Sequence, residues 1–145
     1  MKTRNFLFTG LLALASTVAA NAQTFDIDML KAQPVYSAEK GQGYDILAAP
    51  KAKSNAPFFY SVKVADGNYK VTVVLGSKKK AGKTVVRAEN RRLMLDEVST
   101  RKGEFKTYSF IVNKRSPYIT DKMNVKIKPR EKETFTWDEK LTLEF

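Results

Sequence analysis

Apolar and polar residues alternate one by one over much of the second half of this chain, and no other feature constrains its fold so strongly. From Phe58 to Val64 every second residue is apolar, and the same holds from Tyr69 to Leu75. A period of two places successive side chains on opposite faces of a β-strand. Asp66-Gly67-Asn68 lies between the two segments and is a strong turn signal. We therefore predict that they form a β-hairpin.

Further strand-like segments follow at short intervals toward Phe145. They cover 83–89, 92–95, 104–112, 123–128 and 140–145. Turn or break signals separate them at Asn90, Lys102-Gly103, Ser116-Pro117 and Pro129. No segment has helical periodicity over three turns, and Pro and Gly interrupt 29–57, where we expect loops with short strands. Strands spaced by roughly 8–12 residues predict an all-β fold, an antiparallel β-sandwich or jelly roll.

Residues 1–22 have the pattern of an export signal. Lys2 and Arg4 form a basic start, 6–20 is apolar, and Ala20-Asn21-Ala22 is a small-x-small cleavage site. These three parts are those of a secretory signal peptide. An uncleaved membrane anchor is the less favoured alternative, because the apolar run is shorter than the roughly 20 residues that span a bilayer. We expect an exported chain, periplasmic or extracellular, with one domain at 23–145.

Histidine and cysteine are both absent from the sequence. Without histidine no Ser-His-Asp triad can form, because no imidazole can take the proton from the serine hydroxyl. Without cysteine there are no disulfides or thiolate nucleophiles, and the common zinc sites lose both of their preferred ligands. We therefore expect no catalytic residue and no enzyme of a histidine- or cysteine-dependent kind.

The chain is strongly basic, with 26 Lys and Arg residues against 15 Asp and Glu residues and a net charge of +11. Basic residues gather at Lys78-Lys79-Lys80, at Arg101-Lys102 and from Lys126 to Arg130. Such a charge attracts polyanions by long-range steering. Export argues against nucleic acid as the partner, and we expect no membrane partner once the signal peptide is removed. An acidic polysaccharide is then favoured; the alternative is that the lysines only keep a β-rich surface soluble.

Four sequence blocks, taken together, resemble a known family. They are Asp66-Gly67-Asn68-Tyr69-Lys70-Val71-Thr72-Val73, Val86-Arg87-Ala88-Glu89-Asn90-Arg91-Arg92-Leu93-Met94-Leu95, Trp137-Asp138-Glu139-Lys140-Leu141-Thr142-Leu143-Glu144-Phe145 and, more weakly, Tyr36 with Gly41-Gln42-Gly43-Tyr44. The blocks resemble the N-terminal β-sandwich domain of secreted rhamnogalacturonan acetylesterases of the GDSL (SGNH hydrolase) family. In that family a galactose-binding-like, carbohydrate-binding-module-like jelly roll precedes a flavodoxin-like catalytic domain. The resemblance implies a galactose-binding-like fold for 23–145 and, as partner, either an acidic pectic polysaccharide or an esterase catalytic domain.

The motifs of the family's catalytic half do not occur in this sequence. That half opens with Gly-Asp-Ser and closes with Asp-x-x-His, and neither is present, so no catalytic residue carries over. The resemblance implies a C-terminally truncated domain that lacks the strand pairing back onto the first. We expect a non-catalytic accessory domain that binds acidic glycan weakly or docks on a catalytic domain. The alternatives are a purely structural or interaction domain, and an inactive remnant of an SGNH esterase.

Six residues are candidates for contact with a ligand: Tyr36, Tyr44, Arg91, Arg92, Tyr118 and Trp137. Aromatic rings can stack on the apolar C–H face of a sugar, and the three tyrosines occur in loop-like segments, where binding residues concentrate. A planar guanidinium can hold a uronate carboxylate with two hydrogen bonds. Packing or an ordinary ion pair is the alternative for each residue. We expect no cofactor; a structural calcium site is less favoured, because its candidate ligands lack EF-hand spacing: Asp26, Asp28, Asp138 and Glu144.

Overall fold

The computed structural model describes residue 25 and residues 32–46, 56–131 and 137–145. The predicted signal peptide, Asp26 and Asp28 lie outside these residues. The described residues form β1 (Gln42–Asp45), β2 (Phe59–Lys63), β3 (Gly67–Gly76), β4 (Gly82–Ala88), β5 (Arg92–Thr100), β6 (Phe105–Lys114), β7 (Tyr118–Thr120), β8 (Met123–Asn124), a 3-10 turn η1 (Pro129–Glu131) and β9 (Lys140–Glu144). Among them no helix is long and apolar enough to cross a membrane.

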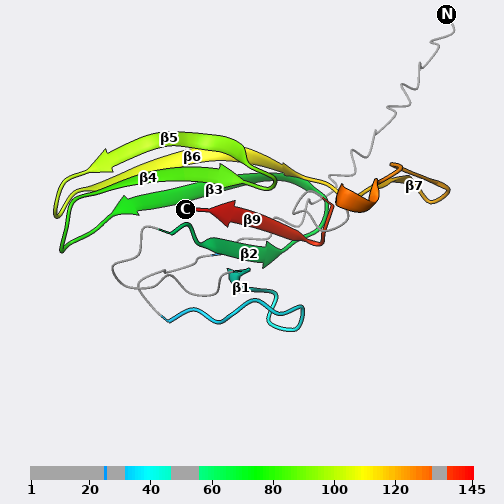
Figure 1. The fold of residues 1–145 in the computed structure, drawn as a ribbon, viewed down its shortest axis with the longest axis horizontal. Helices are drawn as coiled ribbons and strands as arrows, with labels where there is room; N and C mark the ends of the chain where they lie inside the picture. Colours follow the sequence, from blue (N-terminus) through cyan, green and yellow to red (C-terminus); the bar gives the residue numbers. More distant parts are fainter. Residues whose placement is uncertain (1–24, 26–31, 47–55, 132–136) are drawn as a thin grey trace, which may run out of the picture.

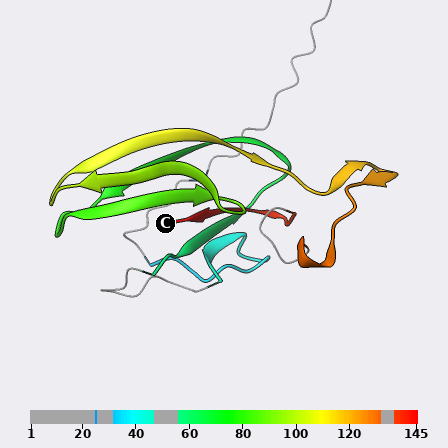
Figure 2. The same ribbon diagram turned by 45° about the horizontal axis from the view of Figure 1, so that its top comes forward.

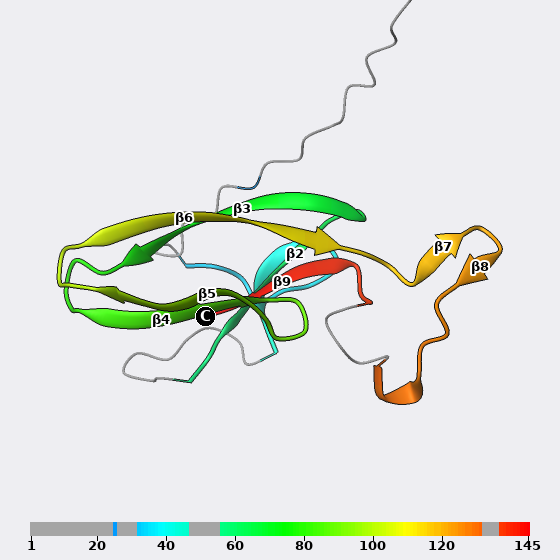
Figure 3. The same cartoon turned by 90° about the horizontal axis from the view of Figure 1, so that it is seen from above.

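Two layers of antiparallel strands make up the body of the protein (Figures 1 and 2). One layer is a five-stranded sheet in the order β1-β2-β9-β4-β5, and the other is the pair β3–β6. Within the larger sheet, β9 lies between β2 and β4. A separate two-stranded sheet, β7–β8, projects from one end of the body (Figure 3). The predicted all-β antiparallel sandwich is therefore confirmed.

The core lies between the pair β3–β6 and the five-stranded sheet. Two clusters of buried side chains fill it, one that includes Ala88 and Val112 and another that includes Val86. These three residues are fully buried. Every second residue of β3 packs in or against the clusters, as the alternation predicted. Burial of this apolar surface is the main force that holds the two layers together.

The hairpin predicted between 58–64 and 69–75 is wrong, although both segments contain strands. β2 pairs with β1 and β9, whereas β3 pairs along its whole length with β6. The chain around Asp66 instead crosses from one layer to the other. Both strands bury their apolar faces in one core, but from opposite sides, so their alternation is the same in either arrangement.

The strand predicted at 123–128 is wrong in extent. Only Met123–Asn124 is paired, and its partner is Tyr118–Thr120, which the alternation did not predict. Met123 and Val125 are both exposed. The apolar residues of this segment therefore do not pack against the core. Alternating apolar residues stabilise a strand only when one face of that strand is buried.

Candidate functional site

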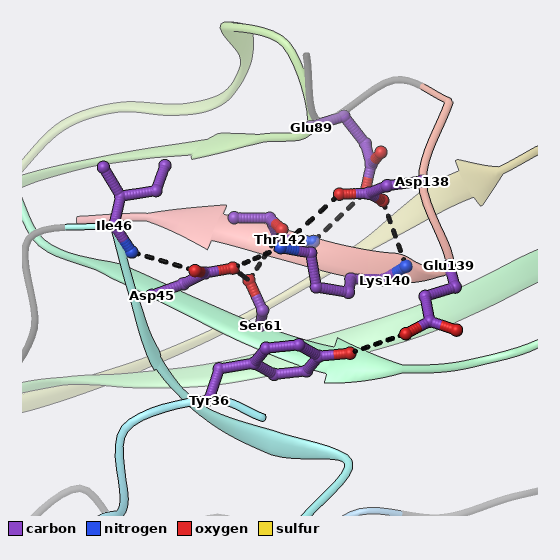
Figure 4. A network of polar contacts seen from close by, with 9 residues as sticks. All are labelled: Tyr36, Asp45, Ile46, Ser61, Glu89, Asp138, Glu139, Lys140 and Thr142. Atoms are coloured by element: carbon purple, nitrogen blue, oxygen red, sulfur yellow. Dashed lines mark hydrogen bonds and ion pairs between the residues drawn. The ribbon is translucent and has the colours of Figure 1, made fainter. Parts of the chain in front are cut away.

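Lys140 is the centre of a polar network on the outer face of the five-stranded sheet (Figure 4). Its Nζ lies 2.6 Å from Oδ2 of Asp45 and 3.7 Å from Oδ2 of Asp138. The same Asp45 oxygen accepts a hydrogen bond of 2.7 Å from Oγ of Ser61. Ser61 is opposite Thr142 in the pairing of β2 with β9, and their hydroxyl oxygens are 2.8 Å apart. The network thus follows from the register, which places these side chains in neighbouring rows of one face.

The middle of this network is closed to solvent. Ser61 is 0% exposed and Thr142 is 1% exposed, and a buried hydroxyl left without a hydrogen bond would cost about 1–3 kcal/mol. Burial works to raise the pKa of Asp45, but hydrogen bonds from Lys140 and Ser61 outweigh it and hold that pKa below its usual value. A serine that no substrate can reach is no nucleophile. The network therefore joins β1, β2 and β9, with Ser61 as a buried structural hydroxyl.

Tyr36 lies at the edge of the network, half-buried under Lys140. Nζ of Lys140 is 4.8 Å from the centre of the Tyr36 ring, within the range of a cation–π contact. The Tyr36 hydroxyl donates to Oε1 of Glu139 at 3.4 Å, and Glu139 also pairs with Lys63 at 3.0 Å. Burial and then the charge of Glu139 raise the pKa of Tyr36 to about 12. Because Lys140 occupies one face of the ring, at most the other face can stack on a sugar.

Glu89 is a buried carboxyl in the turn between β4 and β5. It is 8% exposed, and its carboxylate accepts a 3.1 Å hydrogen bond from the N–H of Thr142. Its own N–H donates to the Thr142 carbonyl at 2.8 Å. Burial raises the pKa of Glu89 to about 7, against a lowering by the Thr142 N–H; nearby Asp138 raises it further, while Arg92 and Lys114 lower it. Glu89 therefore ties the turn to β9, because it hydrogen-bonds to both the N–H and the carbonyl of Thr142.

The backbone of this turn is left-handed at two residues that are not glycine, Glu89 (φ 52°) and Arg91 (φ 63°). This conformation costs roughly 1 kcal/mol or more at such residues, and it persists where neighbouring contacts enforce it. Here the enforcing contacts are the hydrogen bonds between Glu89 and Thr142. The turn leaves the side chains of Arg91 and Arg92 exposed.

We call the end of the body whose strand ends carry Arg91, Arg92, Arg115 and Trp137 the arginine end. β4 and β6 end at this side of the body, and β5 and β9 begin there (Figure 1). The guanidinium of Arg115 lies 5.2 Å from the centre of the Trp137 ring, which is half-buried. All three arginines are exposed, and none forms an ion pair with a carboxylate of the described residues. Within the described part of the chain, no carboxylate is therefore paired with these three guanidinium groups.

The charges beneath the arginine end are matched. Lys114 is 5% exposed and its Nζ lies 2.8 Å from Oδ1 of Asp66. Hydrogen bonds from Lys114 and Ser116 lower the pKa of Asp66. Burial raises the pKa of Asp138, which lies nearer the middle of the network. Since the inner cation already has its carboxylate, the positive charge available to a ligand belongs to the surface arginines.

The structure brings three of the six predicted ligand contacts to one place and leaves two elsewhere. Arg91, Arg92 and Trp137 share the arginine end. Tyr36 is in the network on the outer sheet face. Tyr118 is 72% exposed on the projecting β7–β8 hairpin.

The sixth candidate, Tyr44, is a core residue and cannot stack on a ligand. It is 7% exposed, and its ring makes edge contacts with Phe58 and Tyr60 at centroid distances of 6.0 and 5.6 Å. The glycines around it suggested a loop, but Tyr44 is in β1 and pairs with Tyr60. Residues directly opposite each other in two paired strands point to the same face of the sheet, so Tyr44 faces the core as Tyr60 does.

Sequence reasoning missed Arg115 and Glu89. Arg115 stands just before the Ser116-Pro117 break, and no local pattern links it to Trp137, which follows much later in the chain. Glu89 directly follows the apolar run of β4, but acidic residues are almost never buried unless they are paired. The local sequence therefore predicts neither its burial nor its bond to Thr142.

The calcium alternative gains no support from the two candidate ligands that the structure describes. Oε1 of Glu144 lies 2.8 Å from Nη1 of Arg87, and Asp138 faces Lys140. Within residues 25, 32–46, 56–131 and 137–145 no cluster of three or more metal-ligating side chains is found. Asp26 and Asp28 lie outside this range.

Comparisons with protein-family models, curated proteins and solved structures find no match to this chain. The resemblance to rhamnogalacturonan acetylesterases therefore rests on the four sequence blocks. Three of these blocks meet at β9, where Tyr36 contacts Glu139 and Glu89 contacts Thr142. The blocks thus include Lys140 and Thr142 of the network and part of the arginine end, but not Asp45 or Ser61.

Proposed function

We propose that this chain is an exported, non-catalytic accessory domain, related to the galactose-binding-like domains of pectin acetylesterases, that binds acidic glycan at the arginine end. The observation that carries the proposal is that three exposed arginines, unpaired with any described carboxylate, lie at one end of the body, where Arg115 contacts the half-buried indole of Trp137. Without the predicted signal peptide, 24 basic and 15 acidic residues leave a net charge of +9, which adds long-range attraction for a polyanion.

A polyuronate chain offers the two groups that this surface can recognise. Its carboxylates accept paired hydrogen bonds from a guanidinium, which are stronger than bonds between neutral groups. The C–H face of its sugar ring is apolar and packs on an indole. Exposed ion pairs contribute only about 0–1 kcal/mol each, so a surface of this kind binds weakly and gains from several contacts along one chain.

Binding without catalysis agrees with the burial of the Ser61 hydroxyl and the Glu89 carboxyl group. Ser61 is fully buried and bonded to Asp45. Glu89 has the raised pKa of a general acid, but its carboxylate is buried and bonded to the Thr142 N–H. A general acid must reach the atom that it protonates. We accordingly expect no turnover of a chromogenic acetyl ester.

Removing charge from the arginine end is expected to weaken glycan binding about tenfold, which corresponds to about 1.4 kcal/mol. The variant is Arg91→Gln with Arg92→Gln, titrated with oligogalacturonate by calorimetry at low salt. The matched control is Lys78→Gln with Lys79→Gln, which removes the same charge from the loop between β3 and β4 at the other end of the body. The control should lose less than about threefold, because only long-range attraction changes.

Trp137 provides a second readout of the same titration, since it is the only tryptophan. Its fluorescence should change on binding in the natural chain and in the lysine variant. Equal losses of affinity in the arginine and lysine variants would show that only net charge matters, and the arginine end would not be a specific site. No heat and no fluorescence change with millimolar oligogalacturonate would refute the proposal.

A further inference from the structure

The β7–β8 hairpin, which we call the arm (residues 117–125), stands apart from the sandwich. Among the described residues its strands pair only with each other, and the N–H of Val125 donates to the Pro117 carbonyl at 2.7 Å where the two strands meet the body. Figure 3 shows the arm projecting beyond the end of β6. It therefore presents its side chains on more than one side.

Apolar side chains are concentrated on the arm and are exposed there. Tyr118 is 72% exposed, Ile119 59%, Met123 55% and Val125 38%. Isolated exposed apolar residues are ordinary, whereas several on one projecting element mark a surface that something covers. The residues are short of core contacts because the arm has no second layer within the described part of the chain.

Exposed cations accompany the arm along the chain. Arg115 precedes it, Lys122 is on it, and Lys126, Lys128 and Arg130 follow it, whereas the acidic residues of this stretch are Asp121 and Glu131. The arm is therefore an apolar hairpin accompanied in sequence by these five basic residues, which we call the basic collar. Its charge disfavours a second copy of this chain as the partner, because two arms would bring like charges together.

We propose that the arm docks on the surface of an anionic lipid bilayer and inserts its apolar side chains at the level of the headgroups. This goes beyond the proposed glycan binding and shares only Arg115 with it. Anionic headgroups match the collar, and lysine and arginine can bury their alkyl stems while their charges stay at the headgroups. Tyr118 has the amphipathic ring that favours this interface. A projecting hairpin can enter a flat bilayer while the sandwich stays in water.

The arrangement contains both of the signals that peripheral binding requires. A small apolar insertion alone gives marginal, reversible attachment, and a basic patch alone is screened by salt. Together they give attachment that depends on anionic lipid and on apolar contact. The sequence-based expectation of no membrane partner did not consider the arm, because its exposure appears only in the tertiary structure.

The test is co-sedimentation of the exported protein with vesicles of phosphatidylglycerol and phosphatidylcholine, compared with phosphatidylcholine alone. We expect binding to the mixed vesicles only. Ile119→Ser with Met123→Ser should weaken it about tenfold. The matched control, Val74→Ser with Ile111→Ser, changes two equally exposed apolar side chains on the flat β3–β6 face and should leave binding unchanged. Lys126→Gln with Lys128→Gln should weaken binding and reduce its dependence on salt.

Several outcomes would overturn the proposal. They are equal binding to neutral vesicles, equal losses in the arm and control variants, and absence of vesicle binding at low salt. If the natural chain sediments as a dimer and the arm variant as a monomer, the arm is a protein interface instead. The affinity for oligogalacturonate should stay unchanged in Ile119→Ser with Met123→Ser, so that failure of this proposal and failure of glycan binding are separate results.

Discussion

Replacing Glu89 by Gln is expected to make the protein more stable than the natural chain at pH 8 and to leave the two within about 1 kcal/mol of each other at pH 5. The glutamine carbonyl can still accept the hydrogen bond from the Thr142 N–H. It carries no charge at any pH, so the cost of burying a carboxylate disappears. The variant should therefore lose most of the decrease in stability that the natural chain shows as the pH rises through neutrality.

The sign follows from the pKa of Glu89, which is raised from 4.5 to about 7 in the folded protein. The folded state then holds this proton more tightly than the unfolded chain does. The stabilisation is fully present below pH 4.5 and is lost as the pH rises through about 7. At about 1.4 kcal/mol per pKa unit, the change amounts to about 3 kcal/mol. The raised pKa of Asp138 acts in the same direction, whereas the lowered pKa values of Asp45 and Asp66 act at more acidic pH.

Urea unfolding from pH 5 to pH 8 measures this effect, with Glu97→Gln as the matched control. Glu97 is exposed and paired with Lys83, and such a pair contributes about 0–1 kcal/mol. Its variant should follow the natural pH profile. Parallel profiles for the natural chain and Glu89→Gln would show that Glu89 is ionised across this range, and the assignment of a buried neutral acid would fail.

Gly43→Ala is expected to destabilise the protein by about 3 kcal/mol or more, because no space exists for a side chain at this position. A Cβ on Gly43 would lie 2.5 Å from the Pro34 carbonyl oxygen and 2.6 Å from the Tyr36 nitrogen, and the backbone φ is +151°. The segment cannot move away without loss. The N–H of Tyr44 donates to the Pro34 carbonyl and the N–H of Tyr36 donates to the Tyr44 carbonyl, each at 2.8 Å.

Thermal unfolding followed by circular dichroism checks this result against Gly82→Ala. Gly82 has open space around the position of a Cβ and no left-handed backbone, so its replacement should change stability by less than about 1 kcal/mol. For Gly43→Ala we expect a midpoint lower by roughly 10 °C. The tyrosine titration should also shift toward neutral pH, because Tyr36 would leave Lys140 and Glu139. Similar midpoints for the two variants would contradict the close approach.

The sequence was most informative where burial alone decides the structure. The alternation in β3 and in β9 correctly marked strands, because a strand with one face in the core needs apolar residues at every second position. The same argument placed Val62 and Tyr60 in the core. It failed at 123–128, where the alternation belongs to an arm with an exposed surface.

The partners of the strands could not be obtained in this way. Alternation reports which face is buried but not which strand lies alongside, and the turn signal at Asp66 fitted both a hairpin and a crossing between layers. The candidate site depends on these partners. Arg115 comes to Trp137 only because β6 ends beside the start of β9, and Glu89 is buried only because β4 is the neighbour of β9.

The sequence alone predicted an all-β chain with a strong positive charge. It also excluded the histidine and cysteine chemistry of many enzymes. Those properties depend on composition and on local periodicity, which a linear sequence states directly. The tertiary structure decided that Tyr44 is in the core, that Glu89 is a buried acid, and that Arg115 contacts Trp137. These three features depend on contacts between residues far apart in the chain, and such contacts form only when the strands pair and pack in the folded protein.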